Sequence, residues 1–352
     1  MITIDLITGF LGSGKTTFLK EYAQYLMKKG LRIGILENDY GAVNVDMMLL
    51  KDLEGENCEL EMIAGGCDAD CHRRRFRTKL IAMGMCGYDR FLVEPSGIFD
   101  VDEFFDILHE EPLDRWYEPG SVITIVDANL EEEMSEEENY ILASEAASAG
   151  KIVFSKIGKN LKTEKEAQME EKGSIAKAEE SISKVLAHIN IALKQIKCER
   201  VIEEKDCLCK NWDTLTKADF QDLMSAGYTP ENYQKLDFEQ DSVFESLYFL
   251  NKKISVENMK KAAEELFQNP DCGHIFRIKG FLNTNYKEEV MMENKMEDEM
   301  EKVDKPRITK AESWKEFNAT RKNISIQPVK EGQEVLIMIG AGLKQEKIEE
   351  CL

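Results

Sequence analysis

The feature that most constrains the fold is a glycine-rich segment near the start of the chain, Gly9-Phe-Leu-Gly-Ser-Gly-Lys-Thr-Thr17. It follows a β-branched, apolar run at residues 2–8, which predicts a buried strand, and it leads into an amphipathic pattern that predicts a helix over residues 15–29. A Gly-x-x-x-x-Gly-Lys-Thr spacing between a strand and a helix is the pattern of a phosphate-binding loop. At average glycine usage, a chance match is on the order of one in a hundred.

The residue types of this segment suit the binding of a nucleotide together with Mg²⁺. The glycines allow backbone amides to close around phosphates without side-chain clashes, and the start of the helix adds its dipole. We expect the Lys15 ammonium group to reach the β- and γ-phosphates and the Thr16 hydroxyl to ligate Mg²⁺. The predicted nucleotide-binding residues of the loop are Gly9, Gly12, Ser13, Gly14, Lys15, Thr16 and Thr17.

Acidic residues follow two further predicted strands. Glu37 and Asp39 come after a strand predicted at residues 31–36, and Glu94-Pro-Ser-Gly97 comes after one predicted at residues 90–93. The carboxyl ends of parallel strands form the edge at which such sheets bind ligands. We therefore expect the three acids to surround Mg²⁺ and the attacking water, and the Gly97 amide to sense the γ-phosphate. The alternative is that these acids end their strands and face water.

Strands and helices alternate along the first part of the chain. Further strands are predicted at residues 122–126 and 152–154, and a helix is predicted at residues 76–85. This alternation predicts an α/β fold, the parallel sheet of a P-loop nucleoside triphosphatase with helices on both faces. We assign residues 1–210 to this domain, with a charged helical extension at residues 163–197.

A different pattern begins after a connecting helix and linker, which we place at residues 211–241 with the helix at 217–225. Residues 242–352 read as a smaller α+β domain, with an insertion at residues 284–312 that is rich in Glu, Met and Lys. Its predicted strands are residues 243–249, 274–281, 324–329 and 335–339, and its predicted helices are residues 256–267 and 345–351.

Composition limits the partners and the compartment. The formal net charge of −21 disfavours nucleic acid and membrane surfaces as partners. The basic cluster around Arg73, Arg75 and Arg77 is expected to face acidic neighbours or nucleotide phosphate. No apolar run is long enough to span a bilayer and nothing resembles a signal peptide. The odd number of cysteines, nine, argues against a disulfide framework, so we expect a soluble, cytoplasmic protein.

Several motifs occur in a characteristic order: the glycine-rich loop, Glu-Asn-Asp-Tyr-Gly, Gly-Gly-Cys, Glu-Pro-Ser-Gly and Val-Ile-Thr-Ile-Val-Asp-Ala. In this order they resemble the CobW/HypB/UreG family, most closely its CobW-like branch, over most of residues 1–155. His274-Ile-Phe-Arg-Ile-Lys-Gly-Phe281 resembles, more loosely, the second domain of that branch. The resemblance implies a Mg²⁺-dependent GTPase that delivers a metal ion, or inserts a corrinoid or other metal cofactor, into a client protein.

The chain departs from the family at its metal-binding motif. Where the family has Gly-Cys-x-Cys-Cys, this chain reads Gly66-Cys-Asp-Ala-Asp-Cys-His72, so only the first cysteine is in place. Thiolate, imidazole and carboxylate groups all bind Zn²⁺ or a similar transition metal. The candidate ligands are therefore Cys67, Asp70, Cys71 and His72. The equally weighted alternative is that Cys67 packs near the nucleotide and the others cap the following helix.

The base-reading motif is also altered. The usual Asn-Lys-x-Asp is replaced by Ser155-Lys156-Ile157-Gly158, in which Ser155 and Lys156 remain expected nucleotide contacts. Losing the carboxylate that accepts from guanine removes roughly 1.5–3 kcal/mol of discrimination against adenine. GTP is preferred through the family likeness alone. Two alternatives stay open: a P-loop ATPase or kinase of relaxed base specificity, and a non-catalytic nucleotide-binding regulator or scaffold.

Motion of the loops is expected to connect nucleotide and metal. Closure of the segments at residues 39–41 and 94–97 on the γ-phosphate would carry the change to residues 67–72. Because no single arginine stands out as a finger, we hypothesise slow intrinsic turnover that is raised by homodimerisation or by the client.

Overall fold

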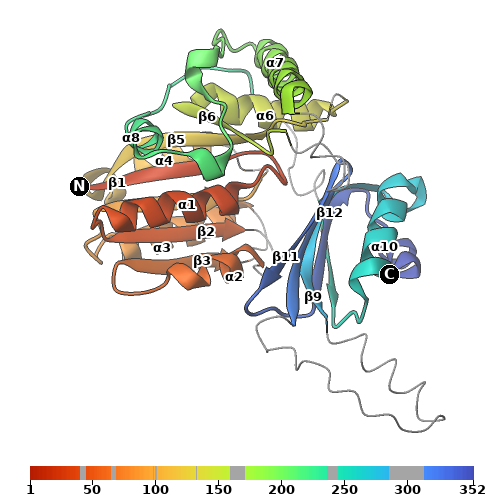
Figure 1. Ribbon diagram of the computed structural model, residues 1–352. Coiled ribbons are helices and arrows are strands. Elements are labelled where there is room, and N and C mark those ends of the chain that lie inside the picture. Colours follow the sequence, from red (N-terminus) through yellow and green to blue (C-terminus); the bar gives the residue numbers. More distant parts are fainter. Residues whose placement is uncertain are drawn as a thin grey trace, which may run out of the picture. The chain divides into compact units, whose positions relative to one another are not determined.

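The computed structural model describes residues 1–39, 45–64, 69–97, 99, 101–131, 133–158, 171–235, 245–284 and 313–352 (Figure 1). The chain divides into two compact units, Met1–Phe238 and Glu239–Leu352. Each unit contains its own sheet and its own hydrophobic core.

The first unit is built on a seven-stranded sheet with the order β3-β2-β4-β1-β5-β6-β7. All of its neighbouring strands run parallel, which confirms the predicted sheet. Its central strand, β1, lies between β4 and β5. The strands are β1 (Ile2–Thr8), β2 (Ile33–Asp39), β3 (Cys58–Ala64), β4 (Arg90–Pro95), β5 (Tyr117–Asp127), β6 (Lys151–Ser155) and β7 (Cys207–Leu208).

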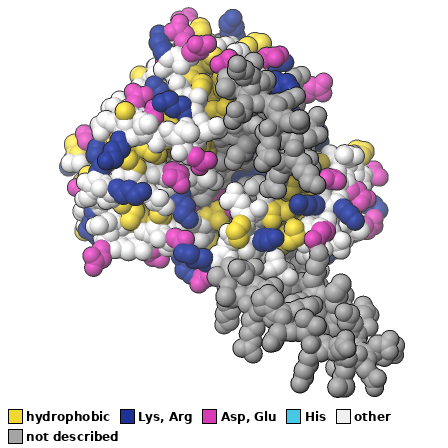
Figure 2. All heavy atoms as spheres, viewed as in Figure 1, with side chains coloured by type: hydrophobic (Ala, Val, Ile, Leu, Met, Phe, Trp, Pro, Cys, Tyr) yellow, Lys and Arg dark blue, Asp and Glu magenta, His cyan; other side chains and the backbone are white. Residues whose placement is uncertain are grey.

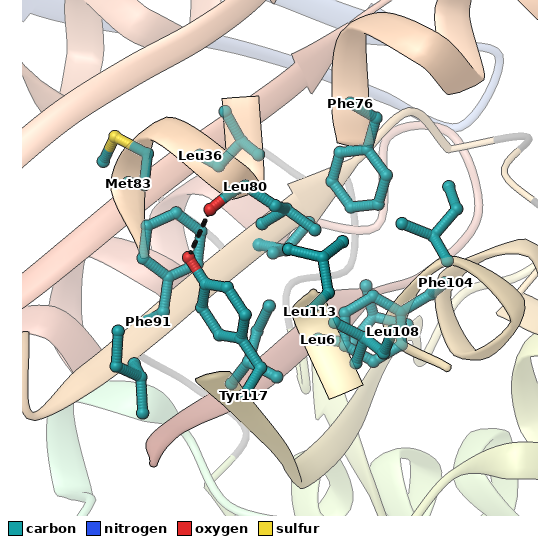
Figure 3. Packing of buried hydrophobic residues seen from close by; sticks show 14 of the residues in the cluster. Leu6, Leu36, Phe76, Leu80, Met83, Phe91, Phe104, Leu108, Leu113 and Tyr117 are labelled. Atoms are coloured by element: carbon teal, nitrogen blue, oxygen red, sulfur yellow. Dashed lines mark hydrogen bonds between the residues drawn. The ribbon is translucent and has the colours of Figure 1, made fainter. Parts of the chain in front are cut away.

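Helices cover both faces of this sheet. Successive residues of a strand point to opposite sides, so neighbouring apolar residues of β1 belong to different cores. Leu6 of β1 belongs to a core with α3 and α4, and Ile7 belongs to a second core with α1 and α8. Figure 3 shows the first core, where the Tyr117 hydroxyl donates to the Leu80 carbonyl oxygen at 2.8 Å. The helices of the unit are α1 (Lys15–Lys28), α2 (Val45–Leu50), α3 (Ala69–Met83), α4 (Val101–Leu108), α5 (Leu113–Trp116), α6 (Glu136–Ser148), α7 (Glu171–Gln195) and α8 (Lys217–Met224).

The segment predicted as a connector contributes to this first unit. Its helix α8 packs on α1, where the ring of Phe220 lies 4.8 Å from the ring of Tyr25 and 6.4 Å from that of Tyr22. Phe220 and Leu223 are members of the α1 core. Residues 211–235 therefore help to hold α1, the helix that follows the phosphate loop.

The second unit is an antiparallel sheet with helices, as the smaller α+β domain was predicted to be. Its strand order is β11-β10-β9-β12-β8, and its two helices share one core with the sheet through Met259, Leu266 and Ile348. The predicted insertion lies, apart from residue 284, outside the described residues. The elements are β8 (Glu245–Leu250), α10 (Val256–Gln268), β9 (His274–Asn283), β10 (Trp314–Thr320), β11 (Asn323–Val329), β12 (Val335–Ala341) and α12 (Gln345–Cys351).

Some elements differ from the predictions. The helix predicted from residue 76 begins at Ala69. The prediction placed its start too late because the residues before Phe76 are mostly polar, and Phe76 is the first side chain of the helix described as buried. The strand β3 was missed, since it is an edge strand in which Glu59 and Glu61 alternate with apolar residues. Strand β10 was missed for a similar reason, because its only buried side chains are Phe317 and Ala319.

The middle of β1 is fixed by a buried ion pair. Arg90 of β4 contacts the Asp5 carboxylate through Nε and, at 2.8 Å, through a terminal nitrogen. The same carboxylate accepts from the Tyr22 hydroxyl at 3.0 Å and from the Ser121 N–H at 2.7 Å. Side chains and backbone from α1, β4 and β5 thus converge on β1, the strand that carries the phosphate loop.

Candidate functional site

The loop after β1 has a backbone that glycine alone adopts readily. The φ angles of Gly9, Gly12 and Gly14 are 145°, 77° and 102°. These values lie in the left-handed region, where a side chain is strained. At Gly9 a Cβ atom would also lie 2.2 Å from the carbonyl oxygen of Ile125. The glycines of the motif are therefore required by the path of the chain between β1 and α1.

The side chains of the loop fit a phosphate group. Lys15 is only 7% exposed, and its Nζ donates to the Gly9 carbonyl oxygen at 2.8 Å. The buried Oγ of Ser13 makes no hydrogen bond with any described residue. A buried polar group without a partner costs about 1–3 kcal/mol, which an anionic ligand at the loop would offset. The N-cap of α1, Gly14, has no side-chain cap, so the first amides of the helix are open to an anion.

Oxygen-bearing side chains gather beside the loop. The Thr16 hydroxyl donates to Oε1 of Glu94 at 2.7 Å. Glu94 near the end of β4 is the register partner of Glu37 near the end of β2, and both are 2% exposed. Two neighbouring buried carboxylates repel each other, and a divalent cation would relieve that repulsion. Hydroxyl and carboxylate oxygens are the ligands that Mg²⁺ prefers.

Gly97 lies directly against the phosphate loop. A Cβ atom on Gly97 would meet the backbone nitrogen of Leu11 at 2.8 Å. The segment that follows Glu94 is therefore in contact with the loop, where it was expected to sense a phosphate. Asp39 ends β2 in register with Ala64, but its side chain lies outside the described part of the chain, as do residues 40–44.

The altered base motif follows β6. Lys156 is held at the loop, because its Nζ donates to the Gly12 carbonyl oxygen at 2.8 Å and to Asp127 at 2.6 Å. Ser155 is buried, and its hydroxyl donates to the carbonyl oxygen of Val126 at 3.3 Å. Gly158, which stands where the family has a carboxylate, adopts a φ of 71°. Lys156 therefore lies at the loop even though the acid of the motif is gone.

The sequence did not indicate the part played by Trp212. This residue follows β7, and its indole N–H donates to the Phe154 carbonyl oxygen at 3.1 Å. Its ring lies over the start of α1, edge-on to Phe18 at 5.6 Å, and a Cβ on Gly14 would meet it at 3.1 Å. A lone tryptophan in a polar segment was the available signal.

Glu145 is a second residue that the sequence did not single out. It lies in α6, is 0% exposed, and accepts a hydrogen bond from the Gly9 N–H at 3.3 Å. The Thr8 hydroxyl donates to the same oxygen at 3.0 Å. The signal was an acid within the otherwise apolar and small run of residues 140–147.

The candidate transition-metal site falls largely outside the described residues. Cys67 and the side chains of Asp70 and His72 are not described, while Cys71 is half-buried in the first turn of α3. Since α3 begins at Ala69, the last three candidates lie on consecutive helical positions, about 100° apart around the axis. Among side chains that are described, no group of three metal-binding residues occurs. The metal site stays a prediction.

The basic cluster of α3 faces acidic neighbours, as one of the two expectations had it. Arg73 and Arg77 contact Glu110 at 2.9 and 2.7 Å, and Lys79 contacts Glu61 at 2.7 Å. Over the described parts of the face in Figure 2, acidic and basic side chains are interspersed. No described helix has the length and apolar character needed to cross a membrane.

The loop, its lysine and the neighbouring carboxylates define a nucleotide-binding protein of the P-loop class. Residues 3–184 match the family model described as CobW/HypB/UreG, nucleotide-binding domain. The chain belongs to this family.

Relatives are similar over part of the chain. The zinc chaperone YjiA of Escherichia coli (strain K12) is 30% identical over 166 residues, which are 44% of this chain and 49% of YjiA. The zinc chaperone YeiR of the same strain is 30% identical over 159 residues, 44% of this chain and 47% of YeiR. The chain thus spans about half the length of the curated relatives it matches. The likeness to the crystal structure of Zn(II)-bound YjiA GTPase from E. coli covers 99% of this chain and 97% of that chain, at 16% identity and a TM-score of 0.32.

Proposed function

We propose that this chain binds and hydrolyses GTP with Mg²⁺ and uses the cycle to deliver a metal ion, or a metal-containing cofactor, to a client protein. The observation that carries the proposal is the Thr16–Glu94 hydrogen bond with Glu37 beside it, next to the phosphate loop. Membership of the CobW/HypB/UreG family supports the nucleotide, and relatives named zinc chaperones support the cargo.

Each residue of the loop has a part in this proposal. Lys15 leaves the Gly9 carbonyl oxygen and donates to the β- and γ-phosphates, while the amides of residues 9–17 hold the remaining oxygens. Thr16 and Glu94 would hold Mg²⁺, and Glu37 and Asp39 would orient its water shell and the attacking water. Bound Mg²⁺ would neutralise charge that develops on the phosphates.

The metal cargo would be held by residues 67–72. We propose Cys67, Asp70, Cys71 and His72 as its ligands, with Zn²⁺ as the first candidate because thiolate and imidazole suit it. The contact between Gly97 and the loop offers a route from the nucleotide to the rest of the domain. Closure of the residue 94–97 segment on the γ-phosphate would then change the affinity of the cargo site.

Base selection is affected by Gly158, which has no carboxylate to accept hydrogen bonds from guanine. We propose that Lys156 still supports the base, since it is held by Asp127 and the Gly12 carbonyl oxygen. Discrimination against ATP would be weak if no other acid replaces the lost one. An ATPase of relaxed base specificity is therefore the second candidate function.

We also propose a compartment and partners for the protein. The eight cysteines that the structure describes form no disulfide, which suits a reducing compartment, and we place the protein in the cytoplasm. Its client would be a metalloprotein or a corrinoid-dependent protein. Homodimerisation, or the client itself, would raise slow intrinsic hydrolysis.

The first experiment is calorimetric titration of the metal-depleted full chain with GTP and with ATP, each with Mg²⁺. We expect GTP to bind more tightly, and Lys15→Ala to lose at least a hundredfold in affinity, because it removes the charge on the phosphates. Lys28→Ala, an exposed lysine of the same helix, is the matched control and should bind as the parent does. Equal binding by the Lys15→Ala variant would overturn the site assignment.

The cargo is tested by repeating the titration after adding Zn²⁺. We expect Zn²⁺ to bind and to shift GTP affinity, and Cys67→Ala to abolish that shift while the exposed Cys209→Ala retains it. If Zn²⁺ binds neither the nucleotide-free protein nor the GTP-bound protein, the proposed metal delivery fails, while the proposed nucleotide binding stands. Equal affinity for GTP and ATP would instead favour the ATPase of relaxed specificity.

A further inference from the structure

The Glu145 carboxyl group is buried next to the phosphate loop with only part of its bonding capacity used. Oε1 accepts from the Thr8 hydroxyl at 3.0 Å and from the Gly9 N–H at 3.3 Å. Oε2 is buried and makes no hydrogen bond with any residue that the structure describes. A buried carboxyl group is costly unless it is paired, and each such group calls for an explanation. Nothing in the capping of α6 needs it, because Ser135 and Glu138 form the capping box of that helix.

Gly9 connects Glu145 to the lysine of the loop. The N–H of Gly9 donates to Glu145, and the carbonyl oxygen of the same residue accepts from Lys15 Nζ at 2.8 Å. Gly9 has little room to shift, since its α-carbon lies against the backbone of Ile125. Glu145 is fixed from its other side as well, because the Thr124 hydroxyl of β5 donates to its carbonyl oxygen at 2.9 Å. The distance between the carboxyl group and the loop is therefore set by two strands.

The charge of Glu145 depends on pH in the neutral range. Burial raises the pKa of Glu145 to about 8, while Lys15 and the hydrogen bonds from Thr8 and Gly9 act in the opposite direction. Lys15 of α1 is the charged group that acts on it. The groups facing it from β1 and β5 are the neutral hydroxyls of Thr8 and Thr124. From α7, His188 is directed to Asn139 at 2.7 Å. A neutral carboxyl group with its proton on Oε2 can accept both hydrogen bonds on Oε1.

We propose that Glu145 is a positioning residue of the phosphate loop: in its neutral form it holds Gly9 for the nucleotide, and in its ionised form it opposes nucleotide binding. The inference rests on the proposed function only in that a nucleotide binds at this loop. When Lys15 turns to the phosphates, its charge is shared with them and no longer offsets a carboxylate at Glu145. The carboxylate would then face anionic phosphates across a buried space, where repulsion is strong. Binding near pH 8 is therefore coupled to uptake of a proton by Glu145.

The test compares the pH dependence of GDP binding in the parent, in Glu145→Gln and in Glu136→Gln. The first variant keeps an oxygen acceptor for Thr8 and Gly9 but cannot ionise. Glu136 is an exposed acid in the first turn of the same helix, so its variant is the matched control. Calorimetry with GDP and Mg²⁺ between pH 6.5 and 8.8 is run in two buffers of different ionisation enthalpy, which counts the protons taken up. Taking the ratio of two proteins at each pH cancels the titration of the nucleotide itself.

We expect the parent to lose roughly fivefold in affinity, relative to Glu145→Gln, between pH 7 and pH 8.8. Near pH 8 the parent should take up a fraction of a proton that Glu145→Gln does not, and Glu136→Gln should follow the parent. Parallel pH profiles for the parent and Glu145→Gln would overturn the inference and leave the nucleotide site intact. If no protein binds GDP at any pH, the proposed function itself fails. Should Glu145→Gln fail to fold, the proton count of the parent decides, and no uptake at pH 8 would reject the inference.

Discussion

Two buried carboxyl groups lie at the central strand β1, and their hydrogen bonding differs: Asp5 is in the middle of the strand, and Glu145 of α6 lies next to its carboxyl end. Asp5 meets the guanidinium group of Arg90, the Tyr22 hydroxyl and the Ser121 N–H, so both of its oxygens are bonded. Glu145, next to the carboxyl end of β1 at Thr8, has hydrogen bonds from described residues on one oxygen only. The charge of Asp5 is matched by Arg90, whose guanidinium group also donates to the Met224 carbonyl oxygen at 2.8 Å and lies outside the phosphate loop. Glu145 shares its neighbouring cation, Lys15, with the phosphate loop.

The difference shows how one strand contributes to stability at its middle and to binding at its carboxyl end. The fully hydrogen-bonded Asp5–Arg90 pair holds β1 against β4, but it has no group whose charge or bonding would change when a ligand binds. An incompletely bonded carboxyl group beside a lysine that must move can respond, and it reduces the stability of the free protein. Functional sites are commonly where such imbalance is retained.

The largest expected effect is at Asp5. Asp5→Asn leaves the Arg90 charge buried without its partner, which should lower the free energy of unfolding by roughly 3–5 kcal/mol. Urea unfolding followed by circular dichroism measures this change. GDP affinity of the folded variant should stay close to that of the parent, because Asp5 lies away from the loop. A loss below about 1 kcal/mol would show that the pair contributes little.

At the Glu145 end the effect depends on pH, and its sign follows from the raised pKa. In the folded chain the group stays protonated up to about pH 8, whereas in the unfolded chain it ionises near its ordinary value of 4.5. The folded state therefore binds more protons between those values, and stability falls as pH rises through that window, by about 1.4 kcal/mol per pH unit. Urea unfolding at pH 5.5, 6.5 and 7.5 should show Glu145→Gln gaining on the parent at that rate. A constant difference between the two proteins would contradict the prediction.

A smaller effect is expected at Ser13, whose Oγ is buried without a hydrogen bond to any described residue. Ser13→Ala should change the free energy of unfolding of the nucleotide-free chain by less than about 1 kcal/mol, or raise it, since an unsatisfied group is removed. GDP affinity should fall by roughly two- to tenfold if that hydroxyl bonds a phosphate. On the same protein samples, scanning calorimetry measures the stability and titration calorimetry measures the GDP affinity. Unchanged affinity would remove Ser13 from the nucleotide site.

The smallest effect is expected at an exposed ion pair that does not contact β1. The side chains of Arg115 and Glu111 are 68% and 75% exposed. Arg115→Ala should alter the free energy of unfolding by less than about 0.5 kcal/mol, because exposed pairs are screened by water and salt. Urea unfolding at low and high salt is the measurement. A larger loss would mean that charge pairs throughout this protein, including the Asp5 pair, are stronger than their exposure indicates.

Much of the fold could be predicted because it rests on local patterns. The bounds of β1 and α12 agree with the predicted ones, and α1 and α10 differ by one residue, since apolar periodicity marks them clearly. Elements with polar exposed faces were harder to predict, and the start of α3 and the edge strand β3 are the clearest cases. Their residues are held by neighbours that come from elsewhere in the chain.

For the site, the sequence by itself determined the phosphate loop and the acids at the ends of β2 and β4, because a motif and its flanking elements lie within a short stretch of chain. Only the tertiary structure decided that Glu37 and Glu94 are register partners, that Gly97 lies against Leu11, and that Trp212 covers Gly14. It also decided that Glu145 of α6 bonds the Gly9 amide, across 136 residues of sequence. Such contacts depend on the order of strands in the sheet and on helix packing, which no local pattern encodes.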